Sequence, residues 1–207
     1  MSLRVVFDFG AVLFRWRPAL VVARAMPHRA RTAEQLRHSV RDCFQDYGGD
    51  WGQFDLGHID EQEVLARIHR RTGWSVEELR RLMACVKAEL QPQAPVLALL
   101  LQLRERGVPL SYLSNMPGSL AEGLERQNPL HVWFESGVFS SRVQLGKPDP
   151  AIFALAAQRF EHAPSDCLLI DDNAANIEAA RACGWQAERF VGAPALQQAL
   201  RHRGLIG

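Results

Sequence analysis

Carboxylates stand at the ends of two short apolar runs in this chain. Asp8 follows Val5 to Phe7, and Asp171 with Asp172 follows Cys167 to Ile170. Apolar runs of this length, bounded by polar residues, are typical of buried strands. In open parallel sheets ligands bind at the carboxyl ends of the strands, so acids at such positions can hold a metal ion or act as nucleophiles.

A hydroxyl, an amide and an ammonium group follow other apolar stretches. Ser114-Asn115 comes after Val108 to Leu113, and Lys147 comes shortly after Val138 to Ser140. Taken singly, each polar residue is explained by an ordinary turn, a surface charge or a helix cap. Their joint occurrence near the ends of separate strands is better explained by a functional site.

These residue types suit phosphoryl transfer. Carboxylates are ligands that Mg²⁺ prefers, and clustered carboxylates without a cation would repel one another. Lys147, together with hydroxyl or backbone donors, can neutralise charge on a transferring phosphoryl group. Asp8 can then attack phosphorus and form an aspartyl-phosphate that water cleaves.

The elements that must position these residues alternate between helices and short apolar strands from residue 95 onward. The expected strands lie at 5–7, 108–113, 138–140, 167–170 and 186–191. The expected helices lie at 95–106, from Ser119 (capped with Glu122), at 150–160, from after Asn173 to Gly184, and at 194–203. This rhythm predicts an α/β fold with a doubly wound parallel sheet and right-handed crossovers.

Helical spacing without a convincing strand fills the stretch between the first strand and residue 91. The expected helices lie near 18–26, 32–46, 61–71 and 76–90. The pairs that can form capping boxes are Thr32 with Gln35, Asp60 with Glu63, and Ser75 with Glu78. We therefore expect a small inserted helical cap domain at 16–91 and a core domain formed by 1–15 and 92–207.

The composition is that of an ordinary globular protein, with 47% apolar residues, 23% charged residues and a net charge of +1. A nearly neutral chain argues against nucleic acid or an anionic membrane as partner. The four cysteines lack the C-x-x-C spacing of zinc or redox sites. No signal peptide and no membrane-spanning run is visible, so we expect a soluble, cytoplasmic protein. Trp51 and Trp74 leave room for a dimer contact, and a monomer or a homodimer is expected.

Four segments together resemble motifs I to IV of the haloacid dehalogenase (HAD) superfamily of hydrolases, in the same order. They are FDFGAVL, YLSN, GKPDP and LIDDNAANI. The resemblance covers essentially the whole chain and implies an HAD-like Rossmannoid core with a helical cap of the C1 type. The segment FDLGHIDEQEVL is similar to a cap segment of one HAD subgroup. That subgroup includes the glucose-1-phosphatase kind of sugar-phosphate phosphatase and the N-terminal phosphatase domain of soluble epoxide hydrolases.

The resemblance implies a role for each motif residue. Asp8 would be the catalytic nucleophile, and Lys147 would balance the charge of the nucleophile and the phosphoryl group. Ser114 and Asn115 would bind the phosphate. The implied Mg²⁺ ligands are Asp8, Gly10 through its backbone carbonyl, Asp172, and Asp171 directly or through water.

The chain departs from the family at Gly10. Most HAD phosphatases have Asp-x-Asp in motif I and use the second Asp as general acid and base, whereas this chain has Asp8-Phe9-Gly10. General acid–base catalysis typically contributes ~10²–10⁴-fold in rate. Turnover is therefore slow, or the leaving group needs little help, or another residue substitutes. His58 in the cap is a candidate for that substitute.

Residues at the entry to the cap are expected to contact the substrate. Arg15 suits a phosphate or carboxylate, and Trp16 suits either a sugar face or the packing of cap on core. The favoured function is a Mg²⁺-dependent phosphatase of a small phosphorylated metabolite such as a sugar phosphate. The alternatives are a 2-haloacid dehalogenase, which uses no metal, and a non-catalytic protein that binds a phosphometabolite.

Overall fold

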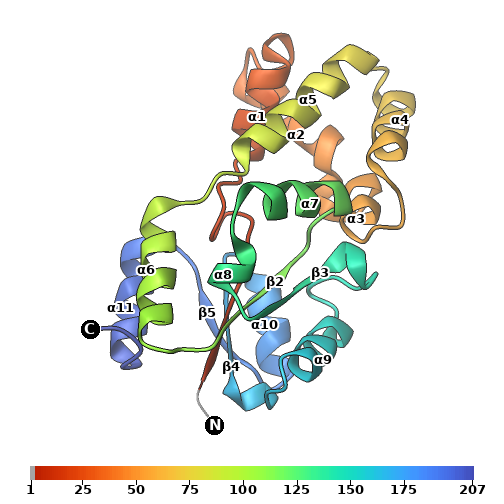
Figure 1. Ribbon diagram of the computed structural model, residues 1–207. Coiled ribbons are helices and arrows are strands. Elements are labelled where there is room, and N and C mark those ends of the chain that lie inside the picture. Colours follow the sequence, from red (N-terminus) through yellow and green to blue (C-terminus); the bar gives the residue numbers. More distant parts are fainter. Residues whose placement is uncertain (1–2) are drawn as a thin grey trace.

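A five-stranded parallel sheet forms the centre of the computed structural model, which describes residues 3–207 (Figure 1). The strands are β1 (Arg4–Phe7), β2 (Leu110–Ser114), β3 (Ser136–Phe139), β4 (Cys167–Asp171) and β5 (Gln186–Arg189). Every neighbouring pair is parallel, and the order across the sheet is β3-β2-β1-β4-β5. The predicted doubly wound α/β fold is confirmed, with β1 in the middle of the sheet.

The alternation of side chains along β1 explains why helices cover both faces of the sheet. Val6 joins an apolar cluster with α9 and α10, whereas Val5 and Phe7 join the cluster that includes α6 and α11. Successive side chains of a strand point to opposite faces, and a parallel sheet buries both. Figure 1 shows these two pairs of helices on opposite sides of the sheet. Their bounds are α6 (Ala94–Glu105), α9 (Pro150–Arg159), α10 (Ala174–Ala182) and α11 (Ala193–His202).

Helices α1 to α5 form an insert beyond the carboxyl end of β1 (Figure 1). Their bounds are α1 (Pro18–Ala25), α2 (Ala33–Phe44), α3 (Asp50–Asp55), α4 (Glu61–Thr72) and α5 (Val76–Glu89). Ser75 and Glu78 form the complete capping box at the start of α5. Thr32 and Asp60 accept the N-cap hydrogen bonds of α2 and α4 from the backbone three residues later. The local sequence thus fixes where these helices begin.

The structure corrects the expected start of one helix and adds two short ones. Helix α7 (Gly118–Gln127) has Pro117 at its N-cap, so Ser119 lies inside the helix and does not cap it. The Ser119 hydroxyl instead donates to Glu61 at 3.0 Å and links the core to α4. Helices α3 and α8 (Leu130–Trp133) are not predicted, because segments of six and four residues carry little periodicity.

The large apolar side chains of the insert are buried. Trp51 is 2% exposed and packs edge-on against Phe44, with ring centroids 4.6 Å apart. Trp74 is 4% exposed, and the Arg29 guanidinium lies 4.9 Å from the centre of its ring. These two side chains are therefore too buried to form the dimer contact for which the sequence left room, and the oligomeric state stays a prediction. Between residues 3 and 207, no helix is both long and apolar enough to cross a membrane.

Candidate active site

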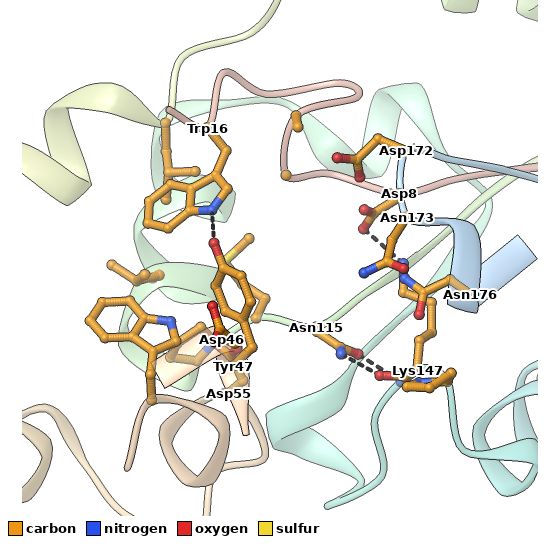
Figure 2. Close-up of a pocket in the computed structure, with 18 residues that line it drawn as sticks. Asp8, Trp16, Asp46, Tyr47, Asp55, Asn115, Lys147, Asp172, Asn173 and Asn176 are labelled. Atoms are coloured by element: carbon orange, nitrogen blue, oxygen red, sulfur yellow. Dashed lines mark hydrogen bonds and ion pairs between the residues drawn. The ribbon is translucent and has the colours of Figure 1, made fainter. Parts of the chain in front are cut away.

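The carboxyl ends of β1, β2 and β4 bring polar residues to one cavity of about 310 Å³. Asp8 follows β1, and its backbone N–H donates to the Ile170 carbonyl at 2.9 Å, which holds Asp8 beside the end of β4. Asn115 follows β2, Asp172 follows β4, and Lys147 comes from the loop before α9. Figure 2 shows these four side chains on one side of the cavity.

Lys147 lies at the centre of a buried charge network. Its Nζ is 2.9 Å from Asp8 Oδ1 and 2.6 Å from Asp171 Oδ2, and its side chain is 1% exposed. Burial alone lowers the pKa of Lys147, but the charges of Asp171 and Asp8 outweigh burial and raise that pKa above its ordinary value. The ammonium group therefore stays charged beside Asp8.

Asp171 is fully buried, and hydrogen bonds hold its carboxylate from several directions. Its Oδ1 accepts from the Asn173 backbone N–H at 2.9 Å and from Asn176 Nδ2 at 3.0 Å. Its Oδ2 accepts from Lys147 Nζ. These contacts fix the orientation of Asp171, so this residue positions the lysine against Asp8.

Asp8, Asp171 and Asp172 form an acidic cluster in which one carboxylate oxygen of each lies within 4.8 Å of the others. Burial raises the pKa of Asp8 above its ordinary value; Lys147 opposes this shift and the two other carboxylates add to it. Burial, aided by Asp171, also raises the pKa of Asp172. A divalent cation would lower both pKa values. Because Asp172 is exposed, the cluster fits Mg²⁺, which takes oxygen ligands and keeps several waters.

Gly10 lines the cavity two residues after Asp8 and has no side chain to extend into it. Its backbone carbonyl stays available as the predicted metal ligand. A Cβ at this position would meet no atom nearer than 3.9 Å, in the Trp16 side chain. Space alone therefore does not require glycine here.

Asn115 and Ser114, the predicted phosphate ligands, differ in their surroundings. Asn115 lines the cavity, and its amide makes two hydrogen bonds of 2.8 Å with the backbone of Lys147, donating to the carbonyl and accepting from the N–H. Ser114 is buried outside the cavity lining, and its Oγ has no hydrogen-bond partner within residues 3–207. Asn115 therefore holds the loop that carries the lysine, and phosphate binding by either residue stays a prediction.

Two residues proposed from the sequence are not brought into the cavity. Arg15 is exposed and is not among the lining residues. Its neighbour Trp16 does line the cavity, and its Nε1 donates to the Tyr47 hydroxyl at 2.8 Å. His58 is also exposed and outside the lining, with its Nδ1 2.9 Å from Gln53 Oε1. Neither the arginine nor the histidine contacts the acidic cluster.

Asp55 is a buried lining residue that sequence reasoning missed. It ends α3, is 8% exposed, and faces the cavity from the side of Trp16 and Tyr47 (Figure 2). Burial raises the pKa of Asp55 well above its ordinary value, the charge of Asp8 adds to the shift, and Trp51 opposes it. The one available signal was its place in FDLGHIDEQEVL, and no local pattern marks a carboxylate there as buried.

Comparisons with known proteins agree with this geometry. A family model described as haloacid dehalogenase-like hydrolase matches residues 4–184. The sesquiterpene phosphatase astK of Aspergillus oryzae is 23% identical over 183 residues, which cover 86% of this chain and 85% of that protein. The phosphoserine phosphatase of Thermus thermophilus is 28% identical over 184 residues, which cover 84% of this chain and 69% of that protein.

A solved structure shares the fold. The HAD family enzyme bt-2542 of Bacteroides thetaiotaomicron, in complex with magnesium and inorganic phosphate, matches with a TM-score of 0.73 at 22% identity. The match covers 91% of this chain and 94% of that one. Sheet order, helical insert and the matched family model all agree, and the chain belongs to the haloacid dehalogenase-like hydrolases.

Proposed function

We propose that this hydrolase is a Mg²⁺-dependent phosphatase that cleaves the monophosphate ester of a small neutral alcohol, sugars included. The observation that carries the proposal is the 2.9 Å contact between Lys147 Nζ and Asp8 Oδ1 within the acidic cluster. Phosphoryl transfer needs a nucleophile, a cationic partner for the phosphoryl charge and oxygen ligands for a metal. The candidates for these three parts are Asp8, Lys147 and the acidic cluster, and their proximity at one edge of the sheet supports the proposal.

Asp8 is the nucleophile of the proposed reaction. Its carboxylate oxygen attacks phosphorus, the bond from phosphorus to the leaving oxygen breaks, and water later hydrolyses the aspartyl-phosphate. Lys147 balances the charge of the nucleophile and the phosphoryl oxygens, while Asp171 holds the lysine in place. When bound by Asp8, Asp172 and the Gly10 carbonyl, Mg²⁺ supplies further neutralisation of phosphoryl charge.

The charges of the cavity favour a neutral organic group on the substrate. Among the described residues that line the cavity, Lys147 is the one lysine or arginine, and it already pairs with two carboxylates. Asp46, Asp55, Trp16 and Tyr47 lie on the side opposite the lysine (Figure 2). A second phosphate or a carboxylate would be repelled there, whereas a sugar or hydrocarbon face can pack on the aromatic rings.

The relatives and the helical insert support the proposal. The two similar proteins from Aspergillus oryzae and Thermus thermophilus are phosphatases by name, and bt-2542 was solved with magnesium and phosphate. We propose 16–91 as the bounds of a cap that covers the cavity, since lids of this kind exclude water during catalysis. The segment FDLGHIDEQEVL supports assignment to the subgroup of glucose-1-phosphatase-like enzymes.

A panel of phosphate esters, assayed with and without Mg²⁺, tests the proposal. We expect hydrolysis of monophosphates of neutral alcohols, weaker hydrolysis of phosphoserine and bisphosphates, and complete loss in EDTA with recovery on adding Mg²⁺. Asp8→Asn removes the nucleophile and should lower kcat by at least ~10³-fold. Activity that survives either EDTA or Asp8→Asn contradicts the proposal. Metal-independent chloride release from 2-chloropropionate would identify a dehalogenase, and tight binding without turnover would identify a binding protein.

A further inference from the structure

The reaction proposed above lacks a proton carrier at the position where the family usually has one. An alcohol leaves as an alkoxide unless an acid protonates it, and water attacks a phosphoryl group poorly unless a base removes its proton. Gly10 cannot do either, because it has no side chain. Another group in the cavity must therefore act, or alcohol esters are cleaved slowly.

Asp55 is held against the core although it belongs to the insert. Its backbone carbonyl accepts a hydrogen bond from the buried Ser140 hydroxyl, which in turn accepts from the Met116 backbone N–H at 2.9 Å. Two residues further, a Cβ on Gly57 would lie 2.5 Å from the Ser141 carbonyl oxygen, so insert and core backbones touch there. These contacts fix Asp55 in place on the cavity wall.

The surroundings of Asp55 favour a carboxyl group that carries a proton. Among residues 3–207 no lysine or arginine pairs with it, and its burial and the nearby Asp8 both disfavour the charged form. The charged or titratable groups of the cavity that face it are Asp8, Asp46, Tyr47, Lys147 and Asp172. An acid kept neutral in this way can donate a proton, as catalytic carboxyl groups in apolar sites do.

Other proton carriers near the cavity fit less well. His58 and Asp46 are both exposed to solvent, and His58 also lies outside the cavity lining. The Tyr47 hydroxyl already accepts from Trp16 Nε1, and burial raises the pKa of Tyr47 further above its ordinary value. Among these candidate proton carriers, all within the described residues 3–207, Asp55 is the one that combines burial, a place on the cavity wall and attachment to the core.

We propose that Asp55 is the general acid and base of this enzyme and replaces the side chain that is missing at Gly10. The assignment rests on the proposed phosphatase function. In the first step Asp8 bonds to phosphorus, the bond to the leaving oxygen breaks, and the Asp55 proton moves to that oxygen to give the alcohol. In the second step water bonds to phosphorus, the bond to Asp8 breaks, and the Asp55 carboxylate takes the proton of the water. One ester and one water thus give one alcohol and one phosphate, and both aspartates are regenerated.

The dependence of rate on the leaving group tests this role. For alkyl phosphates, which need the proton, Asp55→Asn should lower kcat/KM by ~10²–10⁴-fold. For p-nitrophenyl phosphate, whose phenolate leaves without help, kcat/KM should fall much less. Because hydrolysis of the aspartyl-phosphate also loses its base, the variant should release a burst of one equivalent of nitrophenolate before slow turnover. Asp50→Asn is the matched control, since Asp50 lies on the same helix outside the cavity and pairs with Arg71.

A second variant separates proton transfer from a merely structural role. An aspartate at position 10 meets no close contact at its Cβ, so Gly10→Asp in the Asp55→Asn background should restore much of the lost activity on alkyl phosphates. An equal loss on all esters, without burst and without rescue, would overturn the assignment while leaving the phosphatase function intact. A wild-type enzyme that hydrolyses no phosphate ester would overturn both.

Discussion

At the scale of single residues, the site separates groups that react from groups that hold them. In the proposed reaction Asp8 meets the substrate, and Asp8 and Asp172 bind the metal. Asp171 and Asn115 instead hold Lys147 in place. Asp171 contacts its ammonium group, and Asn115 contacts its backbone. Residues that orient reacting groups through hydrogen bonds commonly contribute about 10–100-fold in activity.

Asn115→Ala tests the holding role. The variant removes both hydrogen bonds to the Lys147 backbone, so the loop loosens and the ammonium group is less precisely placed beside Asp8. We expect kcat to fall by about 10–100-fold while Mg²⁺ affinity, measured by calorimetry, stays close to that of the wild type. Asn128→Ala is the control, because Asn128 also donates to a backbone carbonyl but lies at the end of α7. Unchanged kcat in Asn115→Ala would show that the loop needs no such support.

The sequence predicts which strand-end residues form the candidate site better than it predicts which side chains around them are buried. Asp8 and Asp172, the proposed reacting residues, can be identified because each directly follows a predicted apolar strand or its terminal acid, and parallel strands bring their carboxyl ends together. The burial of Asp55 depends instead on how the insert packs on Ser140 and Ser141, far away in the chain. Local patterns contain no information on that packing, so the sequence points to the exposed His58 in the same segment.

At the scale of elements, strong local signals predict helix ends, and short or turn-rich segments escape prediction. The capping residues Thr32, Asp60 and Ser75 mark three helices of the insert within a residue or two. Helix α3 escapes because glycines surround and interrupt it and because it has only six residues. Its position is set by tertiary packing of Trp51 and Phe54 into the apolar cluster.

Glu78, in the capping box of α5, makes the stability of the insert depend on pH. Hydrogen bonding to Arg29 lowers the pKa of Glu78 from 4.5 to about 2, against the effect of burial. A lowered carboxyl pKa stabilises the fold above the unfolded-state value, and this stabilisation disappears as pH falls from about 4.5 to about 2. Glu78→Gln should therefore lower the free energy of unfolding at pH 7 by about 1–3 kcal/mol.

Urea denaturation across the pH range measures this effect. The difference between Glu78→Gln and the wild type should shrink as pH falls below about 4.5 and vanish near pH 2. Glu77→Gln is the control, because Glu77 lies in the same first turn but is exposed and 4.0 Å from Arg81. A difference that stays constant with pH would mean that the charge of Glu78 contributes nothing.

At the scale of the whole molecule, the proposed activity depends on how the insert packs on the core. The contacts that join them include the Ser119 hydroxyl with Glu61, the Ser140 hydroxyl with the Asp55 carbonyl, and the close approach of Gly57 to Ser141. Two of these three contacts lie at or next to Asp55. The packing of the insert on the core therefore also fixes the position of the proposed proton carrier.

Gly57→Ala should disturb the packing of the insert on the core without changing a residue that reacts in the proposed mechanism. The new Cβ would lie 2.5 Å from the Ser141 carbonyl oxygen, and residue 57 also has a φ of +71°, which costs other residues about 1–2 kcal/mol. Gly73→Ala isolates the second effect, because Gly73 has a φ of +69° and nothing within 4 Å of the new Cβ. Both variants should melt at lower temperature. Only Gly57→Ala should also lose kcat/KM on alkyl phosphates, by ~10-fold or more, because the insert and Asp55 shift together. Equal activities in the two variants would show that the contact at Ser141 does not position the insert for catalysis.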